Sequence, residues 1–277
     1  MKIQLPDTFD ISHPERYIFT LEVHPAHFSF ALYNPIENGS YFYQRLEKEK
    51  GLSALASFRE FFFDNEFLSL PFRKIYIINF TSRFSYIPTL MFEEKDDTMY
   101  MEFLLGKSKQ KSKLLNQSLP AMSMTIIHEM EEDTYEFIQR SFINPKYIHH
   151  SSPLISYFRD RVRLVNAGRM LVNLSTQGID VLCFSREDFV LGNHFEFTQK
   201  EDAVYYILFT WKQLKFDQEK DFLYIAGNAE QTKDLMSEIK QYIHNLIPVN
   251  ITPEAHFEGI NTGDIPFELS SLTLCEL

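Results

Sequence analysis

Apolar and polar positions follow strand-like patterns over the first third of the chain. Runs rich in β-branched and aromatic residues predict three consecutive strands, at 17–23, 27–34 and 40–47. His24-Pro25 and Asn38-Gly39 mark the two turns between them, and an Asn-Gly pair is a strong hairpin signal. Apolar residues then recur at helical spacing over 52–68, and an apolar run at 73–80 predicts a buried strand.

The middle of the chain is predicted to alternate between helices and strands. We expect a helix over 84–106, with a proline near its start and Gly106 at its end. Further along, the patterns predict a strand at 122–130, a helix at 132–142, a strand at 146–152 and a helix at 153–165.

From Arg169 the opening pattern returns. The second half predicts strands at 169–175, 178–186 and 189–198, a helix at 201–216, a strand at 221–228, a helix at 230–246 and a strand at 248–251. Leu21-Glu22-Val23 aligns with Val172-Asn173-Leu174 at an offset of 151, and 75–79 aligns with 223–227 at 148. The order and spacing of elements therefore indicate two copies of a βββαβα unit. We divide the chain into domains at 1–165 and 166–277.

The net charge and the glycine content limit which classes of ligand the protein can bind. With 27 basic and 38 acidic residues the formal charge is −11, which argues against nucleic acid as a partner because that needs many basic phosphate contacts. The one dense basic run, KSKQKSK at 107–113, is interpreted as a solvated loop. Only 9 glycines are present, so few backbone positions can approach a phosphate closely.

Cysteine spacing and hydropathy indicate the compartment. Cys183 and Cys275 lie far apart without CxxC spacing, which fits a reducing environment. The start of the chain lacks an apolar segment of the secretory type, and no run of about 18 apolar residues occurs. We expect a soluble, cytoplasmic protein with no membrane insertion.

The duplicated unit, with a strand, tight turn and strand at the start of each copy, resembles the actin-like ATPase fold, also called ribonuclease H-like. Actin, sugar kinases and proteins of the FtsA and PilM type have this fold. With its FxxxP element at Phe84 to Pro88, the chain also resembles a bacterial family of unknown function typical of Bacteroidetes. The resemblance covers residues 16–252 and implies an α/β protein with two lobes around a central cleft.

In ATP-binding members of that fold, two Asp-x-Gly hairpins and a strand ending in Gly-Gly hold the nucleotide. The first hairpin here reads Glu22-Val23-His24 and is followed by Pro25, which blocks phosphate and removes an amide donor. In the second, Asn173 replaces the acid. Ser175, Thr176 and Gln177 offer hydrogen bonds there, and Gly178 permits a tight turn. The third signature has one glycine, in Gly227-Asn228.

Because all three signatures are degraded, the resemblance implies a binding, scaffold or adaptor protein that does not hydrolyse nucleotide, a pseudo-ATPase. We expect a protein partner or self-association, no bound cofactor, and no catalytic or metal-ligating residue. The degenerate cleft would contain Glu22, His24, Asn173, Ser175, Thr176, Gln177, Gly178, Gly227 and Asn228. The alternative is an atypical ATP-binding protein, a weak ATPase or phosphotransferase (kinase), that takes ATP and Mg²⁺ between the lobes.

Other candidate chemistry is weaker. A two-metal nuclease would need clustered carboxylates, and only Glu22 and Asp180 suggest themselves, without a DxD pattern. His149 and His150 are adjacent on a strand, so we expect surface or half-buried side chains that cannot both ligate one ion. The trio Glu22, His24 and His27 is interpreted as a hairpin corner rather than a metal or acid–base site.

The segment 58–67 is rich in phenylalanine. Helical spacing predicts that Phe58, Phe61 and Phe62 face the core, whereas Phe63 lies on another side of the helix.

Overall fold

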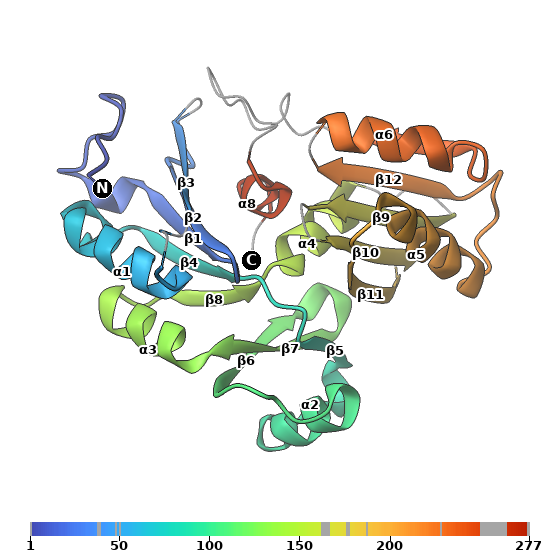
Figure 1. The fold of residues 1–277 in the computed structure, drawn as a ribbon, viewed down its shortest axis with the longest axis horizontal. Coiled ribbons are helices and arrows are strands. Elements are labelled where there is room, and N and C mark those ends of the chain that lie inside the picture. Colours follow the sequence, from blue (N-terminus) through green and yellow to red (C-terminus); the bar gives the residue numbers. More distant parts are fainter. Residues whose placement is uncertain are drawn as a thin grey trace. The chain divides into compact units, whose positions relative to one another are not determined.

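The computed structural model describes residues 2–37, 40–47, 49, 51–161, 167–175, 178–186, 188–227, 229–249 and 265–275. These residues form two units, the first ending at His150 and the second beginning at Ser151 (Figure 1). The turn expected at Asn38-Gly39 lies outside the described residues.

The first unit is built on a five-stranded sheet in the order β3-β2-β1-β4-β8. Its strands are β1 (Ile18–Val23), β2 (His27–Tyr33), β3 (Tyr41–Glu47), β4 (Lys74–Asn79) and β8 (Lys146–His149). Strands β1, β2 and β3 form an antiparallel meander, whereas β4 runs parallel to both β1 and β8. The three predicted N-terminal strands and the fourth are confirmed.

Helices α1 (Ala54–Asp64) and α3 (Glu132–Ser141) contribute to the apolar core of this sheet. Ser53 caps α1 by accepting a hydrogen bond from the Ala56 amide. The predicted stripe is confirmed, since Phe58, Phe61 and Phe62 are buried while Phe63 is 74% exposed.

Side chains alternate along β1, and this alternation positions the candidate site. Phe19 and Leu21 belong to the core, where the ring of Phe19 stacks on three other phenylalanine rings. Glu22 and its cross-strand partner Ser29 do not belong to that core, because alternate side chains of a strand point to opposite faces. A carboxyl group and a hydroxyl group therefore lie on the other face of the sheet.

The predicted helix over 84–106 is wrong in its first half. Phe84–Pro88 is a strand, β5, because it pairs antiparallel with β7 (Met124–Glu131). Only Asp97–Leu105 forms a helix, α2, which ends at Gly106 in a positive-φ conformation. Strand β6 (Ser112–Leu119), which the sequence did not predict, pairs with the other edge of β7 and completes a three-stranded sheet.

The second unit repeats the first sheet, in the order β11-β10-β9-β12-β13. Its strands are β9 (Gly168–Leu174), β10 (Gly178–Ser185), β11 (Asp188–Glu196), β12 (Phe222–Gly227) and β13 (Asn245–Pro248). The registers also repeat. Glu22 of β1 pairs with Ile78, and Asn173, 151 positions after Glu22, pairs with Ala226, 148 positions after Ile78.

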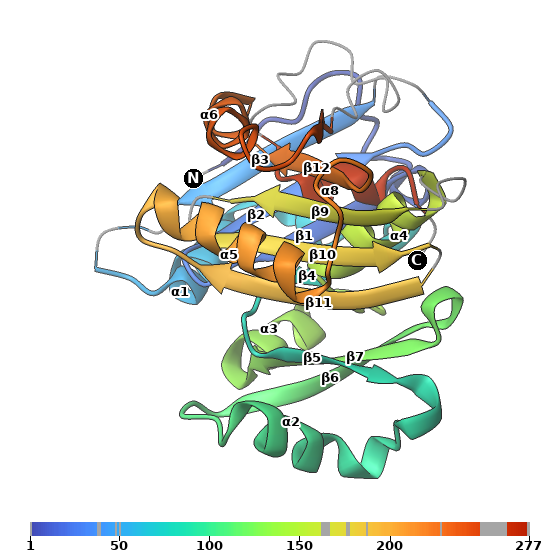
Figure 2. The ribbon, with the colours of Figure 1, turned by 90° about the vertical axis from the view of Figure 1, so that its right-hand side faces the viewer.

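Helices α5 (Lys200–Gln213) and α6 (Ala229–Ile239) share the core of the second sheet, and Figure 2 shows α5 lying across its strands. A capping box between Gln199 and Asp202 begins α5. Helix α6 ends before residue 246, the end expected from the sequence, because β13 occupies 245–248 and pairs with β12.

Two further helices in the described part of the second unit pack against each other. Helix α4 (Ser151–Arg161) packs against α8 (Phe267–Leu272), with the rings of Tyr157 and Phe267 in an edge-to-face contact. Helix α8 lies in the tail beyond 252, where the sequence predicted no element. Among the described residues, no helix combines the length and apolar character needed to cross a membrane.

Candidate functional site

The turn between β1 and β2 is closed by its own hydrogen bonds. The amide of His24 donates to the carbonyl of His27 at 3.1 Å, and the amide of His27 donates to the carbonyl of His24 at 3.3 Å. Pro25 has no amide hydrogen. The remaining amide, that of Ala26, donates to Nδ1 of His24 at 3.1 Å. Each amide of the turn is thus absent or already bonded within the turn.

Glu22, the predicted counterpart of the magnesium-organising acid, is buried beside this turn. The hydroxyl of Ser29 donates a hydrogen bond to Oε2 of Glu22, and Nε2 of His27 lies 4.0 Å from the same oxygen. The structure therefore brings Glu22, His24 and His27 together at one hairpin corner, as the sequence predicted.

A set of closely packed aromatic rings continues from the turn through the first unit; we call it the histidine–phenylalanine cluster. The ring of His24 lies 4.3 Å from His27 and 4.5 Å from Phe80. His150 stacks on Phe80 at 4.2 Å and lies 4.1 Å from His149. We define the cluster by the rings of His24, His27, Phe80, Phe84, His128, His149 and His150.

The ends of neighbouring strands bring these rings together. β1, β4 and β8 are parallel, so their carboxyl ends meet at one edge, and His24, Phe80 and His150 each follow one of these strands. The expectation of surface or half-buried histidines at 149 and 150 is wrong, because both side chains are fully buried. The ring of His150 stacks on Phe80, and the ring of His149 packs at a tilt against Phe84, instead of pointing to solvent.

Two histidines of the cluster have strongly lowered pKa values. Burial, together with the nearby His150, lowers the pKa of His128 to about 3. Burial, and then the charge of Arg45, lowers the pKa of His27 to about 4. Nδ1 of His128 accepts a hydrogen bond from the Asn79 side chain at 2.8 Å, which requires an unprotonated nitrogen. Both imidazoles are therefore neutral at pH 7.

The equivalent turn of the second unit, between β9 and β10, is also closed internally. Ser175 donates its amide to the carbonyl of Gly178 at 2.9 Å, and its hydroxyl oxygen accepts from the Gly178 amide at 3.2 Å. A Cβ on Gly178 would lie 2.7 Å from the His194 ring, so this glycine is required by packing. Thr176 and Gln177, predicted to offer hydrogen bonds, lie outside the described residues.

Asn173 belongs to a buried polar network that sequence reasoning missed. Its side-chain amide donates to Asp180 at 3.2 Å and to Glu268 of α8 at 3.3 Å. Asp180 in turn lies 2.8 Å from Nδ1 of His194. Burial by itself lowers the pKa of His194, but the hydrogen bond and charge of Asp180, with Glu196 and Glu268, raise it above its usual value.

Cross-strand register is the signal that could have found most of this network. Asn173, Asp180 and His194 occupy directly opposed positions on β9, β10 and β11. Opposed residues on one face of a sheet are neighbours, so the hairpin pairing already implies the contact. Glu268 comes from a distant helix, and no local pattern identifies it.

The third signature differs between the units at equivalent positions. Gly227 ends β12 with φ +126°, and a Cβ there would lie 2.5 Å from the carbonyl oxygen of Leu174. The glycine is required by this close approach of two strands. Its counterpart in the first unit is Asn79, whose side chain also donates to the carbonyl of Glu129 at 2.9 Å. Asn228 lies outside the described residues.

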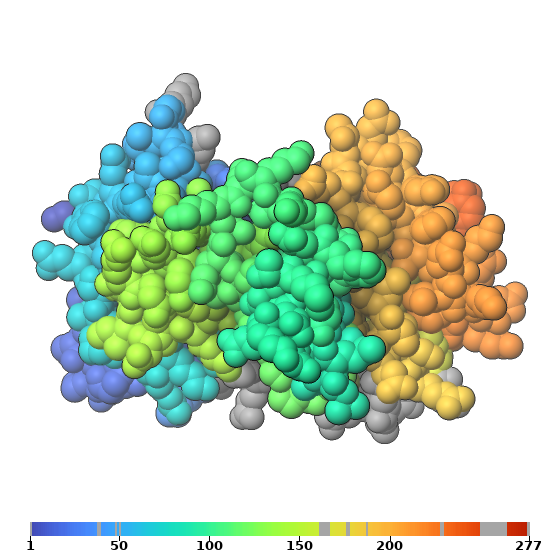
Figure 3. Space-filling view, turned by 90° about the horizontal axis from the view of Figure 1, so that it is seen from below, coloured from blue at the N-terminus to red at the C-terminus, as the bar shows by residue number. Residues whose placement is uncertain are grey.

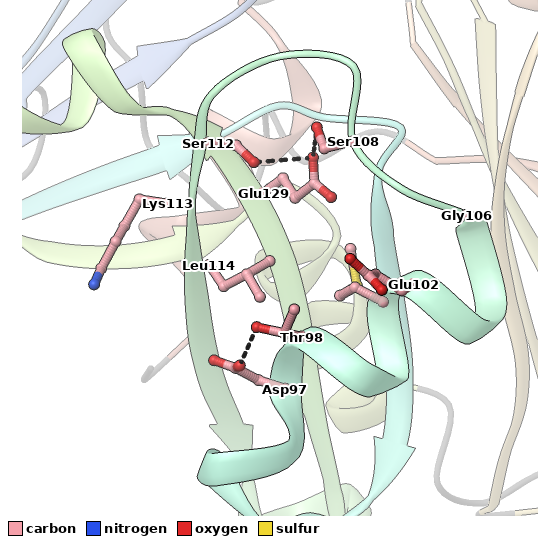
Figure 4. Close-up of a pocket in the computed structure, with 10 residues that line it drawn as sticks. Asp97, Thr98, Glu102, Gly106, Ser108, Ser112, Lys113, Leu114 and Glu129 are labelled. Atoms are coloured by element: carbon pink, nitrogen blue, oxygen red, sulfur yellow. Dashed lines mark hydrogen bonds between the residues drawn. The ribbon is translucent and has the colours of Figure 1, made fainter.

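A separate pocket of about 390 Å³ lies in the first unit, beside α2, β6 and β7 (Figure 4). Glu129 lies at this pocket, where Ser108 and Ser112 donate hydrogen bonds to it, while Lys113 extends away. Arg83 also binds Glu129, through Nε and Nη2. Burial alone would raise the pKa of Glu129, but these donors lower it, so the carboxylate is already neutralised by protein groups.

The repeated sheet order and the paired hairpins define a protein of the actin-like ATPase fold. A solved structure from Bacteroides thetaiotaomicron VPI-5482, described as having this fold and unknown function, superimposes with a TM-score of 0.82 at 29% identity, over 97% of this chain and 99% of that chain. A PilM–PilN type IV pilus biogenesis complex is similar at a TM-score of 0.54 and 10% identity, over 94% and 98%, a likeness of fold alone.

The chain itself belongs to the family described as "Protein of unknown function (DUF3822)", whose model matches residues 6–246. The resemblance to a bacterial family of unknown function with the actin-like fold is thereby confirmed. No curated protein matches the sequence.

Proposed function

We propose that this protein is a non-catalytic binding protein, a scaffold or adaptor that retains the actin-like fold and does not hydrolyse nucleotide. One observation carries the proposal: the first hairpin has no amide available for a phosphate. Pro25 lacks the hydrogen, and the amides of His24, Ala26 and His27 are bonded within the turn. Phosphate sites in proteins depend on free amides pointing at the ligand.

The two histidines of the cluster whose pKa values are strongly lowered supply no positive charge for a phosphate. His27 and His128 are held neutral by burial, so they cannot balance a polyphosphate. The rings of His24 and Phe80, packed 4.5 Å apart, fill space that a glycine-bearing turn would leave open for the ligand. Electrostatics and sterics at the first hairpin thus both support a pseudo-ATPase.

The residues at the acid position of the two hairpins, Glu22 and Asn173, do not fit a magnesium–nucleotide complex either. Glu22 accepts a hydrogen bond from Ser29 inside the sheet. Asn173, at the equivalent position, is neutral and donates to two carboxylates, Asp180 and Glu268. Magnesium needs oxygen ligands in near-octahedral geometry with several retained waters, and the Asn173 amide nitrogen, which donates to two carboxylates, offers it no such ligand.

The proposal extends to compartment and partner. The described cysteines, Cys183 and Cys275, are both free thiols, which supports a cytoplasmic location. A protein partner is the class to test, because a fold without usable nucleotide chemistry retains surfaces for binding, and the PilM–PilN structure is a protein complex with this fold.

Calorimetric titration with ATP and Mg²⁺ tests the proposal. We expect no binding tighter than about 1 mM for the natural chain. Lys233→Ala, an exposed change on α6, serves as the matched control for Glu22→Ala and Asn173→Ala. Micromolar binding that either hairpin variant abolishes, and the control retains, would overturn the proposal in favour of an atypical ATPase or kinase.

A further inference from the structure

The exposed apolar side chains of this protein are concentrated in one short segment. Of 14 large hydrophobic residues that are exposed in the described chain, six lie within residues 90–105. Leu90 is 100% and Phe103 is 86% exposed. We call this set the α2 patch; it consists of Leu90, Met91, Met99, Phe103, Leu104 and Leu105. Figure 3 shows the blue-green atoms of this region uncovered on the face toward the viewer.

Helix α2 buries very little of its apolar surface. Met101 is its one buried residue, and Met101 packs with Ile87 and Ile127 in a small separate core. A surface helix ordinarily turns one apolar stripe inward and polar residues outward. Here Met99 and Phe103, four residues apart on one face of the helix, point away from Met101 into solvent. Large exposed apolar side chains grouped in this way mark interaction surfaces.

Opposite charges stand at the two ends of the patch. The acidic end comprises Glu93, Glu94, Asp96 and Asp97, before and at the start of α2, and the basic end comprises Lys107 and Lys109, which directly follow Gly106. Lys95 pairs with Glu93, and Lys111 pairs with Glu132. Lys107 and Lys109 are exposed and make no ion pair with any residue in the described part of the chain. Helix α2, about 14 Å long at 1.5 Å per residue, separates the two ends.

This charge arrangement does not suit a membrane surface. Interfacial helices carry lysine and arginine along their polar face, which anionic lipids attract. Around α2 the first turn and the residues before it are acidic, and Glu102 adds a further acid on the helix. Anionic lipid would repel that half of the patch, so the arrangement favours a protein surface with the reverse order of charges.

We propose that the α2 patch docks onto the α2 patch of a second copy of this chain, with the two helices antiparallel about a twofold axis. The axis brings the acidic end of each copy to the basic end of the other, so a single sequence supplies both complementary surfaces. Apolar side chains then cover one another between two equivalent ion-pair clusters. This self-association goes beyond the proposed absence of nucleotide chemistry and does not depend on it.

The dimer is expected to be weak and sensitive to salt. Six apolar side chains and a few lysines make an interface at the small end of the range, below about 1,200 Å² in total. Each copy carries a net charge of −11, so the copies repel one another at low ionic strength. At about 0.15 M salt this repulsion is screened beyond about 8 Å, whereas the short-range contacts persist.

Sedimentation velocity on the full chain, over about 1 to 200 μM protein at physiological salt, tests the proposal. We expect a concentration-dependent dimer. Phe103→Asp should raise its dissociation constant at least about tenfold, because a charge would be buried among apolar side chains. Ile143→Asp changes an exposed apolar residue outside the patch, and this matched control should leave the dimer unchanged.

Reversing the charges at the two ends of the α2 patch gives the decisive test. Glu93→Lys with Glu94→Lys leaves Asp96 and Asp97 in place but makes the net charge of the acidic end positive, and Lys107→Glu with Lys109→Glu makes the basic end acidic. Each double variant alone should be monomeric, whereas an equimolar mixture should form a heterodimer because the ends again match. Circular dichroism confirms that each variant is folded. A natural chain that stays monomeric over the whole range, or a mixture that fails to pair, would overturn the proposal.

Discussion

The two hairpin turns have the same backbone plan and opposite chemistry. Beyond the β1–β2 turn lies a cluster of buried histidine and phenylalanine rings, whereas behind the β9–β10 turn lies a network of an amide, two carboxyls and a histidine. Glu22 pairs with Ser29 in the first, and Asn173 pairs with Asp180 at the equivalent place in the second. A duplicated fold therefore does not imply a duplicated site.

Core positions explain why the fold has persisted while the sites have diverged. Leu21 and Phe30 of the first sheet, and Val172 and Val181 at the equivalent positions of the second, are all fully buried. Any apolar residue of suitable volume keeps a sheet packed on its helices. The side chains on the opposite face need only find hydrogen-bond partners, and quite different sets satisfy that condition.

The largest expected effect is loss of the carboxylate that joins the second network. Asp180→Ala removes the acceptor for both Asn173 and His194, and we expect the free energy of unfolding to fall by about 3 to 5 kcal/mol. Urea unfolding followed by far-ultraviolet circular dichroism measures the change.

The equivalent change in the first unit is the matched control. Ser29→Ala removes one hydroxyl donor to Glu22 and should cost about 1 kcal/mol. Equal losses of stability in the two variants would contradict the contrast between the charged network of the second unit and the histidine–phenylalanine cluster of the first.

The third signature is expected to give the next largest effect. Gly227→Ala places a Cβ against the Leu174 carbonyl at a positive φ and should cost about 2 to 3 kcal/mol. At the counterpart position, Asn79→Ala should cost about 2 kcal/mol, because His128 and the Glu129 carbonyl lose a buried donor. Thermal unfolding of both variants provides the comparison.

Replacing Asn79 by glycine, the residue at the equivalent position of the second unit, distinguishes the two causes of destabilisation: lost side-chain hydrogen bonds and crowding by an added Cβ. Asn79→Gly should destabilise at least as much as Asn79→Ala, since the side-chain hydrogen bonds are lost in both. A stabilising effect of Gly227→Ala would show that the close approach to Leu174 does not constrain this position.

The sequence predicted the duplication well because alternation and order are local properties. Strand pairs at an offset of 151 were visible in Leu21-Glu22-Val23 and Val172-Asn173-Leu174, and the registers agree with them. Phe84–Pro88 was predicted as part of a helix because a short run of aromatic residues before a proline shows neither the helical nor the strand periodicity of apolar positions. Only pairing with β7, about forty residues later, makes it a strand.

The site was less predictable for the same reason. Glu22, His24 and His27 are close in sequence, so their meeting at one corner could be inferred from the hairpin alone. Phe80 and His128 reach the cluster through the ends of other strands, and Glu268 reaches Asn173 from a helix 95 positions away. His149 and His150 were predicted to be surface or half-buried because they are adjacent on a strand. Their rings are buried by packing against Phe84 and Phe80, which are distant in sequence.

The smallest predicted effect on stability is a difference in how the two hairpins respond to acid. An unfolded histidine has a pKa of about 6.5, whereas the folded values are about 3 for His128 and about 4 for His27. Below pH 6.5 the unfolded chain binds protons that the folded first unit does not. Its stability should therefore fall by up to about 1.4 kcal/mol per pH unit for each histidine as the pH drops toward 4.

His194 reverses that sign, because its folded pKa is raised by Asp180. The stability it contributes is present below about pH 6.5 and is lost as the pH rises through the folded pKa. Hydrogen exchange of peptides from β1–β2 and β9–β10, corrected for intrinsic rates, should show acid loosening the first hairpin before the second. His27→Gln should flatten the response of the first hairpin, and His244→Gln, at an exposed histidine, should not. Parallel acid responses in the two hairpins would mean that their different side chains do not set their electrostatics.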